Sequence, residues 1–396
     1  MISRKIKNMN PSATVALTSK IAELQRKGIN IITFNVGEPD FKTPINIRNK
    51  AKEGLDLGLT KYTPAPGTIE LREEISKKLY RDNNIEYNYD EIIVSNGAKQ
   101  SLINTLMTLC NEGDEVIIPS PFWVSYIEMV KLADGVPVVV EMDEEDNFDL
   151  NTEKIKKHIT DKTKCIMINT PNNPTGAVYS RERLEEIGKL AVEKDLYIIA
   201  DDIYEKLIYG GEKHISIASL GEEIKNRTIL INGVSKAYAM TGWRIGYAAG
   251  PKEIIKGMTA LQGHMTSGPN TNAQYAAVEA LKNSEESIED MVKEFDKRRK
   301  YLVKRLNSID GIKCNTPKGA FYAMPNVKSF FGRKFNDRVI NNSTDLANYL
   351  LDEAKIAVVP GIAFGIENNI RIAYSNSIKN IEKGMDNMEE ALKKLI

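Results

Sequence analysis

Short runs of apolar residues alternate with stretches of helical apolar spacing between about residues 90 and 250. Strands that alternate with helices in this way typically form a parallel sheet with helices on both faces. The pattern therefore predicts a large α/β unit built on a mostly parallel sheet. Its seven candidate strands are, in order, residues 91–95, 115–119, 136–140, 165–169, 197–200, 228–231 and 245–248.

Helical spacing is clearest in three further stretches. Residues 102–109 carry leucine at helical intervals, and apolar residues at 184–191 do the same after Ser180, a candidate N-cap. Residues 284–309 have apolar side chains at intervals of seven, which predicts one long helix. No glycine-, serine- or proline-rich linker follows it, so we expect this helix to lead directly into a second, smaller domain.

The smaller domain is expected to contain both strands and helices. Strands are predicted at residues 320–324, 356–359 and 370–374. A final helix carries apolar side chains at alternating threes and fours from Ile378 to Leu395, which is typical of an amphipathic packing face.

Composition argues against several classes of protein. Lys+Arg and Asp+Glu are both 54, and this zero formal charge, without a basic tract, disfavours binding to nucleic acid or an acidic membrane. No stretch approaches the ~20 apolar residues of a membrane span, and the first residues lack a signal-peptide core. Cys110, Cys165 and Cys314 are widely spaced in apolar contexts, which predicts free thiols in a reducing compartment. We therefore expect a soluble, cytoplasmic protein with no disulfide.

The three histidines share no metal-ligand spacing with cysteines or carboxylates, so no metal site is expected. Candidate chemistry begins instead at Lys236, which follows the strand at 228–231, with Arg244 eight positions later. A lysine amine attacks an aldehyde when it is rigidly held and partly desolvated, because desolvation lowers its pKa. An arginine fork suits a phosphate. A surface lysine and a salt-bridged arginine are the alternative for any single pair of this kind.

Three other strand ends carry polar groups. Gly97 opens a helix after the first strand, where unpaired backbone N–H groups favour an anion such as phosphate, although an ordinary turn is the alternative. Asn173 lies in a proline-rich loop that fixes the direction of its amide. Asp201 ends a strongly apolar strand, where a carboxylate is costly unless it meets a cation. Asp202 could instead be a solvated or helix-capping side chain.

All four groups lie at the predicted carboxyl ends of strands, where open α/β sheets bind ligands. Together they supply an amine for an aldehyde, a carboxylate for a pyridinium, an amide for a ring hydroxyl, and a helix start with an arginine for a phosphate. Those are the requirements of pyridoxal 5′-phosphate.

Eight segments in the order of a known family extend this interpretation over nearly the whole chain. They are VGEPD at 36–40, KYTPAPG at 61–67, NGAKQ at 96–100, PSPFWVSY at 119–126, NNPTG at 172–176, DDIY at 201–204, SKAYAMTGWR at 235–244 and IRIAYS at 370–375. In these segments the chain resembles the class I aminotransferases of fold type I, and within them the bacterial branch of aspartate aminotransferases.

The resemblance implies an α/β protein with the fold of pyridoxal-phosphate-dependent transferases of type I. A large domain with a mostly parallel sheet flanked by helices would be joined to a smaller α+β domain. The implied boundaries are 1–45 for an N-terminal segment that packs on the small domain and a partner subunit, 46–285 for the large cofactor-binding domain, and 286–396 for the small domain. The working unit would be a homodimer, because Tyr62 matches the tyrosine that reaches the neighbouring subunit's phosphate.

The resemblance also assigns roles to the cofactor site. Lys236 would be the Schiff-base lysine and proton shuttle, and Asp201 would pair with the pyridine nitrogen. Asn173 and Tyr204 would hold the 3′-oxygen. The remaining cofactor contacts would come from Gly97, Ala98, Lys99, Ser235 and Arg244 around the phosphate and from Trp123 stacked on the ring.

For the substrate, the resemblance assigns the α-carboxylate to Arg371 and Gly37, with Trp123 and Asn173 nearby. An arginine suits this role because its fork forms two parallel hydrogen bonds to a carboxylate. No arginine matches the one that animal-type enzymes use for a distal carboxylate, so Lys99 is the candidate. The alternative, a solvent-facing lysine, is disfavoured because a cation opposes the dipole at a helix N-terminus.

The resemblance implies transamination between aspartate or glutamate and a 2-oxo acid such as 2-oxoglutarate, in amino acid biosynthesis. Prephenate aminotransferase, or an aminotransferase for another amino acid, is the nearest alternative. A carbon–sulfur β-lyase would share the fold and cofactor but not the oxo-acid half-reaction. A noncatalytic cofactor-binding regulator is disfavoured, because Lys236, Asp201 and Arg371 are all present.

Overall fold

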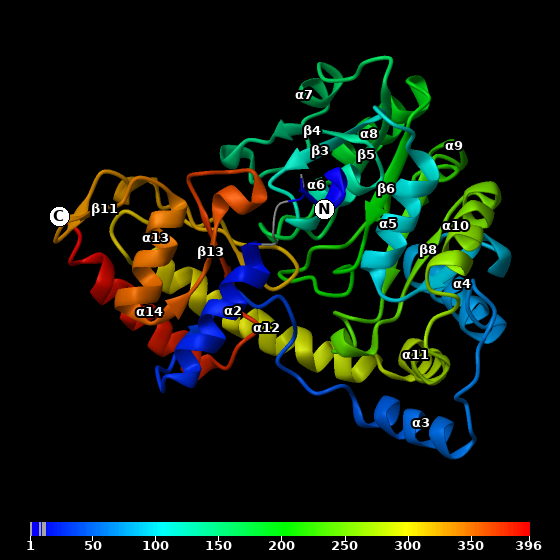
Figure 1. Ribbon diagram of the computed structural model, residues 1–396, viewed down its shortest axis with the longest axis horizontal. Helices are drawn as coiled ribbons and strands as arrows, with labels where there is room; N and C mark the ends of the chain where they lie inside the picture. The colour runs from blue at the N-terminus through cyan, green and yellow to red at the C-terminus, as the bar shows by residue number, and fades with distance from the viewer. Residues whose placement is uncertain (1, 8, 10–12) are drawn as a thin grey trace.

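A seven-stranded sheet organises the larger lobe of the molecule (Figure 1). The structure is a computed structural model that describes residues 2–7, 9 and 13–396. The strand order is β2-β8-β7-β6-β5-β3-β4. All seven predicted strands are present, as β2 (Ile92–Ser95), β3 (Glu115–Ser120), β4 (Val136–Glu141), β5 (Thr163–Asn169), β6 (Tyr197–Asp201), β7 (Thr228–Gly233) and β8 (Gly246–Ala249). Neighbours from β7 to β4 are parallel, whereas β8 runs antiparallel to β2 and β7.

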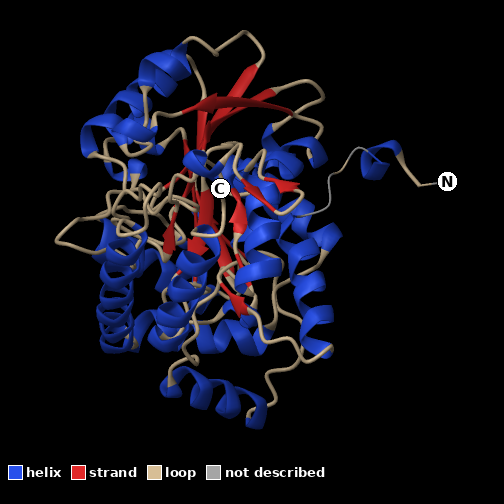
Figure 2. Cartoon of the chain, turned by 90° about the vertical axis from the view of Figure 1, so that its left-hand side faces the viewer, coloured by secondary structure: helices blue, strands red, loops and turns tan. Residues whose placement is uncertain are grey.

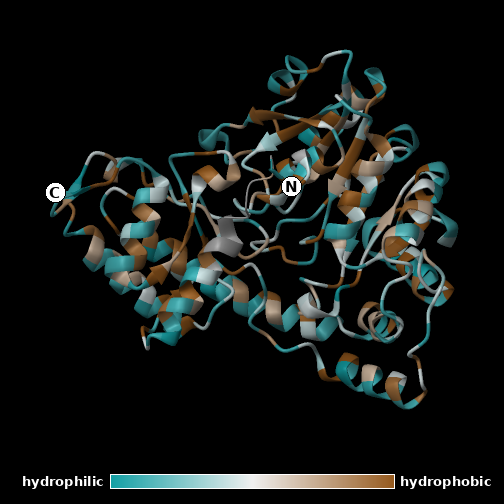
Figure 3. Cartoon of the chain, in the orientation of Figure 1, coloured by the Kyte–Doolittle hydropathy of each residue, from teal (hydrophilic) through white to brown (hydrophobic). Residues whose placement is uncertain are grey.

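Helices cover both faces of this sheet, as predicted, because its strands are apolar on both sides (Figures 2 and 3). One face packs against α5 (Ala98–Leu109), α6 (Ser125–Leu132) and α10 (Lys252–Met265). The other packs against α3 (Ile45–Asp56), α4 (Ile69–Asn83), α7 (Thr152–Lys156), α8 (Arg181–Glu193), α9 (Glu222–Lys225) and α11 (Thr271–Asn283). The predicted N-cap of α8 is confirmed, since the Ser180 side chain accepts from Arg183 N.

The predicted long helix is α12 (Glu285–Leu306), which runs from the larger lobe into the smaller one (Figure 1). There it packs through buried Phe295 and Leu302 against a three-stranded antiparallel sheet and the last helix, α14 (Ile378–Leu392). The sheet order is β13-β14-β9. The remaining elements of this lobe are β9 (Tyr322–Ala323), β13 (Val359–Pro360), β14 (Ile370–Ala373), α13 (Ser343–Tyr349) and the hairpin of β10 (Lys334–Phe335) and β11 (Arg338–Val339).

The single strand predicted at residues 356–359 is wrong, because the structure has two strands there. β12 (Ile356–Ala357) pairs in parallel with β1 (Ile32–Thr33), and β13 pairs with β14 in another sheet. The four consecutive apolar residues show no alternation that would reveal a change of partner.

The N-terminal segment contains α1 (Arg4–Lys7) and α2 (Ala13–Arg26) before β1. β1 attaches it to the smaller lobe, and residues 1, 8 and 10–12 lie outside the described residues. The domain boundaries after residues 45 and 285 stay a prediction. In the described part of the chain, no helix is long and apolar enough to span a bilayer, and no cluster of three or more His, Cys, Asp or Glu side chains could bind a metal ion. The three cysteines are free thiols.

Candidate active site

A pocket of about 380 Å³ lies at the carboxyl ends of β5, β6 and β7 and is closed by residues of the smaller lobe. It brings together most of the residues predicted from the sequence, namely Gly37, Ala98, Lys99, Trp123, Asn173, Asp201, Tyr204, Ser235, Lys236, Arg244 and Arg371. Gly97 precedes the lining residue Ala98 as the N-cap of α5. Tyr62 does not line the pocket, and its side chain is 95% exposed.

Lys236 enters the pocket from the segment that follows β7. Its Nζ donates a hydrogen bond to Gly37 O at 2.7 Å. Burial lowers the pKa of the Lys236 ammonium to about 8; Glu38 opposes this shift, whereas Arg371 and Arg244 add to it. The amine is therefore uncharged in a much larger fraction of molecules than an ordinary lysine, which makes it a competent nucleophile and base.

Asp201 is the last residue of β6 and is only 4% exposed. Its Oδ2 accepts a hydrogen bond from the Tyr126 hydroxyl at 2.7 Å, and its Oδ1 accepts from Ile203 N at 3.3 Å. Burial raises the pKa of this carboxyl to about 6, against the opposing effect of those two donors. A cation placed opposite Asp201 would favour its charged form.

Arg371 lies on β14 of the smaller lobe with only 3% of its surface exposed. Its Nη1 donates to Asn173 Oδ1 at 3.1 Å and its Nη2 to Asn35 O at 2.7 Å, while its Nε has no hydrogen-bond partner among the described residues. Burial lowers its pKa, and the Tyr322 ring stacks 4.6 Å from the guanidinium carbon. A buried guanidinium paired with neutral acceptors is prepared to bind a carboxylate.

Asn173 and Tyr204 meet the same part of the pocket. Because Asn173 Oδ1 accepts from Arg371, the amide nitrogen of Asn173 is left to donate elsewhere. The Tyr204 hydroxyl lies 2.8 Å from the Tyr322 hydroxyl, and burial, followed by Tyr322, raises the Tyr204 pKa well above its ordinary value. Tyr204 therefore acts as a neutral hydrogen-bonding group.

The N-terminus of α5 and Arg244 form a cationic corner of the pocket. Gly97 has a φ of 86° as N-cap and supplies no side-chain cap to the helix, and a Cβ built there would collide with the Arg244 guanidinium. Arg244 is held by Thr241 O at 2.7 Å and Asn96 O at 3.3 Å. Backbone N–H groups at an uncapped helix start, next to an arginine, suit a phosphate.

Lys99 lies at the rim of the pocket on the first turn of α5. Its Nζ donates to Ser125 Oγ at 3.3 Å and lies 4.7 Å from the centre of the Trp123 ring. Burial, followed by the neighbouring Arg244, lowers the Lys99 pKa. No carboxylate of the described residues pairs with Lys99, so its ammonium is available to an anionic ligand.

Sequence reasoning missed several lining residues. They are Asn35, Leu102, Tyr126, Asn169, Ile203, Thr241 and Tyr322. Tyr126 ends the quoted segment 119–126, so its place after a strand end was a usable signal. Tyr322 comes from β9 in the smaller lobe, and nothing in its local sequence indicates that it meets Tyr204.

Known proteins similar to this chain share its full length. The profile of the family described as aminotransferase class I and II matches residues 29–388. An aspartate aminotransferase of Bacillus sp. (strain YM-2) is 47% identical over 393 residues, which are 99% of each chain. A probable aspartate/prephenate aminotransferase of Rickettsia bellii is 46% identical over 99% of this chain and 98% of its own.

Solved structures agree with this fold. The aspartate aminotransferase of Rhizobium meliloti superposes with a TM-score of 0.97 at 38% identity, covering 100% of both chains. The Thermus thermophilus aspartate aminotransferase with maleate superposes with a TM-score of 0.93 at 40% identity, covering 99% of both.

Proposed function

Since this chain belongs to the class I and II aminotransferases, we propose that it catalyses pyridoxal-phosphate-dependent amino transfer between aspartate or glutamate and a 2-oxo acid such as 2-oxoglutarate. The observation that carries the proposal is the convergence of Lys236, Asp201 and Arg371 in one pocket with a cationic corner for phosphate.

The residues present fit pyridoxal 5′-phosphate. The uncapped start of α5 and Arg244 would hold its phosphate, and a side chain at Gly97 would displace the Arg244 guanidinium from its present place. Asp201 would face the ring nitrogen, while Asn173 and Tyr204 would hold the 3′-oxygen and Trp123 would cover the ring. When bound, this cofactor supplies an aldehyde for amines and a protonated ring that withdraws electrons from the substrate's α-carbon.

The chain's own residues then account for the chemistry. Lys236 Nζ takes a proton from the α-carbon of the amino acid and, in the reverse half-reaction, returns a proton to the α-carbon of the product. Its lowered pKa, about 8, matches this work near neutral pH. Asp201 maintains negative charge in a buried site, and its hydrogen bond from Tyr126 fixes its direction.

Two cationic side chains of the pocket, Arg371 and Lys99, would bind the two carboxylates of a dicarboxylic substrate. Arg371 and Gly37 would bind the α-carboxylate, and Lys99 would bind the distal carboxylate. The Thermus relative named above carries maleate, a four-carbon dicarboxylate, which supports this choice. Prephenate remains a second candidate acceptor, because it also has two carboxylates and several relatives are named aspartate/prephenate aminotransferases.

We further propose that the enzyme works as a homodimer with domain boundaries after residues 45 and 285. Tyr62 is 95% exposed in the single chain, and Leu55 and Leu57, at the end of α3, are exposed as well. A subunit interface would cover such exposed apolar side chains, and Tyr62 would reach the neighbouring subunit's phosphate across it.

The direct test supplies the loaded enzyme with aspartate and 2-oxoglutarate and measures oxaloacetate and glutamate together. Equal amounts of both products are expected. Pyruvate and ammonia formed from cystathionine, without glutamate from 2-oxoglutarate, would instead identify a carbon–sulfur lyase. Parallel rates with prephenate as the acceptor decide between the two dicarboxylic substrates.

A further inference from the structure

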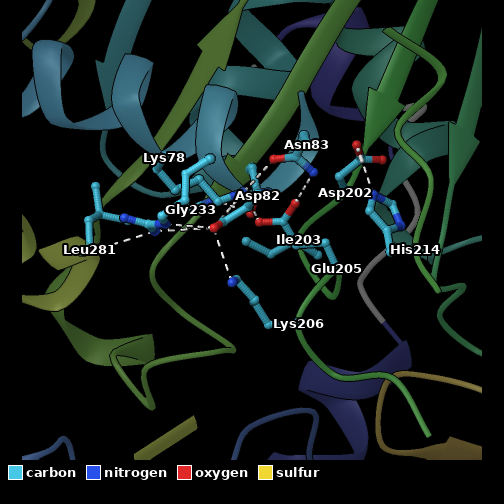
Figure 4. A network of polar contacts seen from close by, with 12 residues as sticks. Lys78, Asp82, Asn83, Asp202, Ile203, Glu205, Lys206, His214, Gly233 and Leu281 are labelled. Carbon is cyan, nitrogen blue, oxygen red and sulfur yellow. Dashed lines mark hydrogen bonds and ion pairs between the residues drawn. The ribbon is translucent and has the colours of Figure 1, made fainter. Parts of the chain in front are cut away.

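A second carboxylate, Asp202, lies directly behind Asp201 and outside the pocket lining. Successive side chains of an extended strand point to opposite sides. Asp201 lines the pocket, and Asp202 points away from it toward His214 (Figure 4). Asp202 is 1% exposed, and its N–H donates to Ile231 O at 2.9 Å, which continues the pairing of β6 with β7. Two adjacent carboxylates are therefore buried at the end of one strand.

His214 is the partner of Asp202. Its Nε2 lies 3.3 Å from Asp202 Oδ2, and the two side chains are 6% and 1% exposed. His214 lies in the segment that follows β6 and also carries Tyr204 and Glu205. Its contact with Asp202 connects this segment to the end of the strand (Figure 4). The pair thus links a wall of the pocket to the interior.

The neighbouring carboxylates have permanently charged partners. Glu205 accepts from Lys78 Nζ and from Asn83 Nδ2, and Asp82 pairs with Lys206 at 3.0 Å and with Arg81 at 2.7 Å (Figure 4). Asp202 differs because its partner is an imidazole, which carries a charge only when protonated. The charge next to Asp201 therefore depends on the state of the Asp202–His214 pair.

We propose that Asp202 and His214 are positioning residues for Asp201. The negative charge of Asp202, offset whenever the adjacent His214 imidazole is protonated, sets how firmly Asp201 retains a proton on the cofactor ring nitrogen. This inference rests on the proposed function, because it needs a ring nitrogen opposite Asp201.

The carboxylates of Asp201 and Asp202 repel each other, because like charges interact strongly in a medium of low dielectric constant. Asp202 acts to raise the pKa of Asp201, after burial and against Tyr126 and Ile203. A more negative potential at this strand end also favours a proton on any basic nitrogen facing Asp201. Removing the Asp202 carboxylate should weaken that proton's retention, and removing the His214 imidazole, which offsets Asp202 whenever it is protonated, should strengthen it.

The other titratable groups around Asp202 and His214 do not supply the same change of charge next to Asp201. Tyr87 and Tyr247 face Asp202, and burial raises both of their pKa values, so both stay neutral phenols. Glu205 faces His214, and its pKa is lowered despite its burial, because Lys78 and then His214 stabilise its charge. His214 therefore lies next to two carboxylates, Asp202 and Glu205.

The first arm of the test uses the protein without cofactor. Only three histidines are present, so the imidazole ¹⁵N resonances of His214 can be assigned by comparison with His214→Gln. Asp202→Asn should shift the His214 resonances, whereas Asp82→Asn, which removes a carboxylate at the far end of the same network, should not. Unchanged His214 resonances in Asp202→Asn would overturn the pairing itself.

The second arm uses the holoenzyme with ¹⁵N in the cofactor ring, followed as the pH is raised. Asp202→Asn should lower the pH at which the ring nitrogen loses its proton by about half a unit or more, and His214→Gln should raise it. Asp82→Asn should lower only the Tm. A ring-nitrogen midpoint unmoved in Asp202→Asn, or moved in the same direction by both variants, would overturn the inference. Wild-type turnover with aspartate is measured alongside, and its absence would count against the proposed function instead.

Discussion

At the scale of single residues, the environment of Lys236 decides whether its amine can react. At a pKa of about 8, roughly a tenth of the molecules carry the uncharged amine at neutral pH, against fewer than one in a thousand for an ordinary lysine. Burial produces this shift because it disfavours the charged form. The fold thus supplies the reactivity that the sequence could only suggest from the placement of Lys236 after a strand.

The pH dependence of cofactor capture tests this environment. Capture needs the uncharged amine, so in cofactor-free protein the capture rate should rise with pH up to about 8 and then level off. Stopped-flow absorbance after mixing with pyridoxal 5′-phosphate measures it, and borohydride-treated Lys236→Ala, which should retain no covalent cofactor, is the control. A rate that continues to rise well above pH 8 would show that Lys236 titrates as an exposed lysine.

The proposed contact between Lys99 and the distal carboxylate is tested by changing the charge at this position. In Lys99→Met, kcat/KM for aspartate and glutamate should fall by about ten- to a hundredfold relative to kcat/KM for alanine, because only dicarboxylates lose a charge-assisted hydrogen bond. Lys99→Arg should recover part of the loss. The kcat/KM for prephenate should fall together with that for aspartate and glutamate. Equal losses for alanine and aspartate would assign Lys99 to the phosphate corner or to the fold.

At the scale of elements, the start of α5 is shaped by Gly97, whose positive φ L side chains rarely adopt. Gly97 has a φ of 86°, and a side chain there would meet Arg244. Gly113 has a φ of 87° but nothing within 4 Å of a built Cβ, so it shares the backbone requirement without the contact. Comparing substitutions at the two positions therefore separates the effect of backbone strain from the effect of disturbing the cationic corner of the pocket.

Gly97→Ala should therefore weaken pyridoxal 5′-phosphate binding by tenfold or more, while Gly113→Ala should cost about 1–2 kcal/mol of stability and leave the affinity unchanged. Equilibrium dialysis of cofactor and thermal unfolding of both variants measure the two effects. Equal affinities in the two variants would mean that the helix start does not hold the phosphate.

Elements with strong periodicity were predictable, and elements defined by distant partners were not. All seven strands of the large sheet, the cap of α8 and the long helix α12 followed from local patterns. The break between β12 and β13 did not, because it is set by pairing with β1 and β14 rather than by any residue within 356–359.

At the scale of the whole molecule, the site combines groups from both lobes. Motifs at strand ends predicted Lys236, Asp201 and Asn173, since each lies beside a clear strand. The contacts that orient the side chains of the site come from far away in the sequence. The Tyr322 hydroxyl contacts Tyr204, and Asn35 O accepts from Arg371. Long-range packing of that kind leaves no local pattern, so sequence alone could give the candidate site residues but not the contacts that orient them.

The proposed dimer makes a prediction about mixed subunits. In a hybrid of Tyr62→Ala and Lys236→Ala chains, one site would combine an intact Lys236 with an intact Tyr62 from the neighbouring subunit. Cofactor affinity and turnover at that site should be restored relative to either parent dimer. Measurement after unfolding and refolding the mixed chains, with each parent treated alone as the control, checks this. Restoration that is absent in verified hybrids would remove Tyr62 from the neighbouring site.

The central claim is amino transfer from a dicarboxylic amino acid, and a half-reaction without any acceptor tests it most directly. The loaded enzyme is mixed with aspartate, glutamate, alanine, phenylalanine or cystathionine, and the cofactor absorbance and released oxo acid are recorded together. We predict one equivalent of oxo acid per site from aspartate and glutamate, with conversion of the cofactor to its amine form and much slower change with alanine. Continuous release of pyruvate and ammonia from cystathionine, with the cofactor spectrum unchanged by aspartate, would contradict the account.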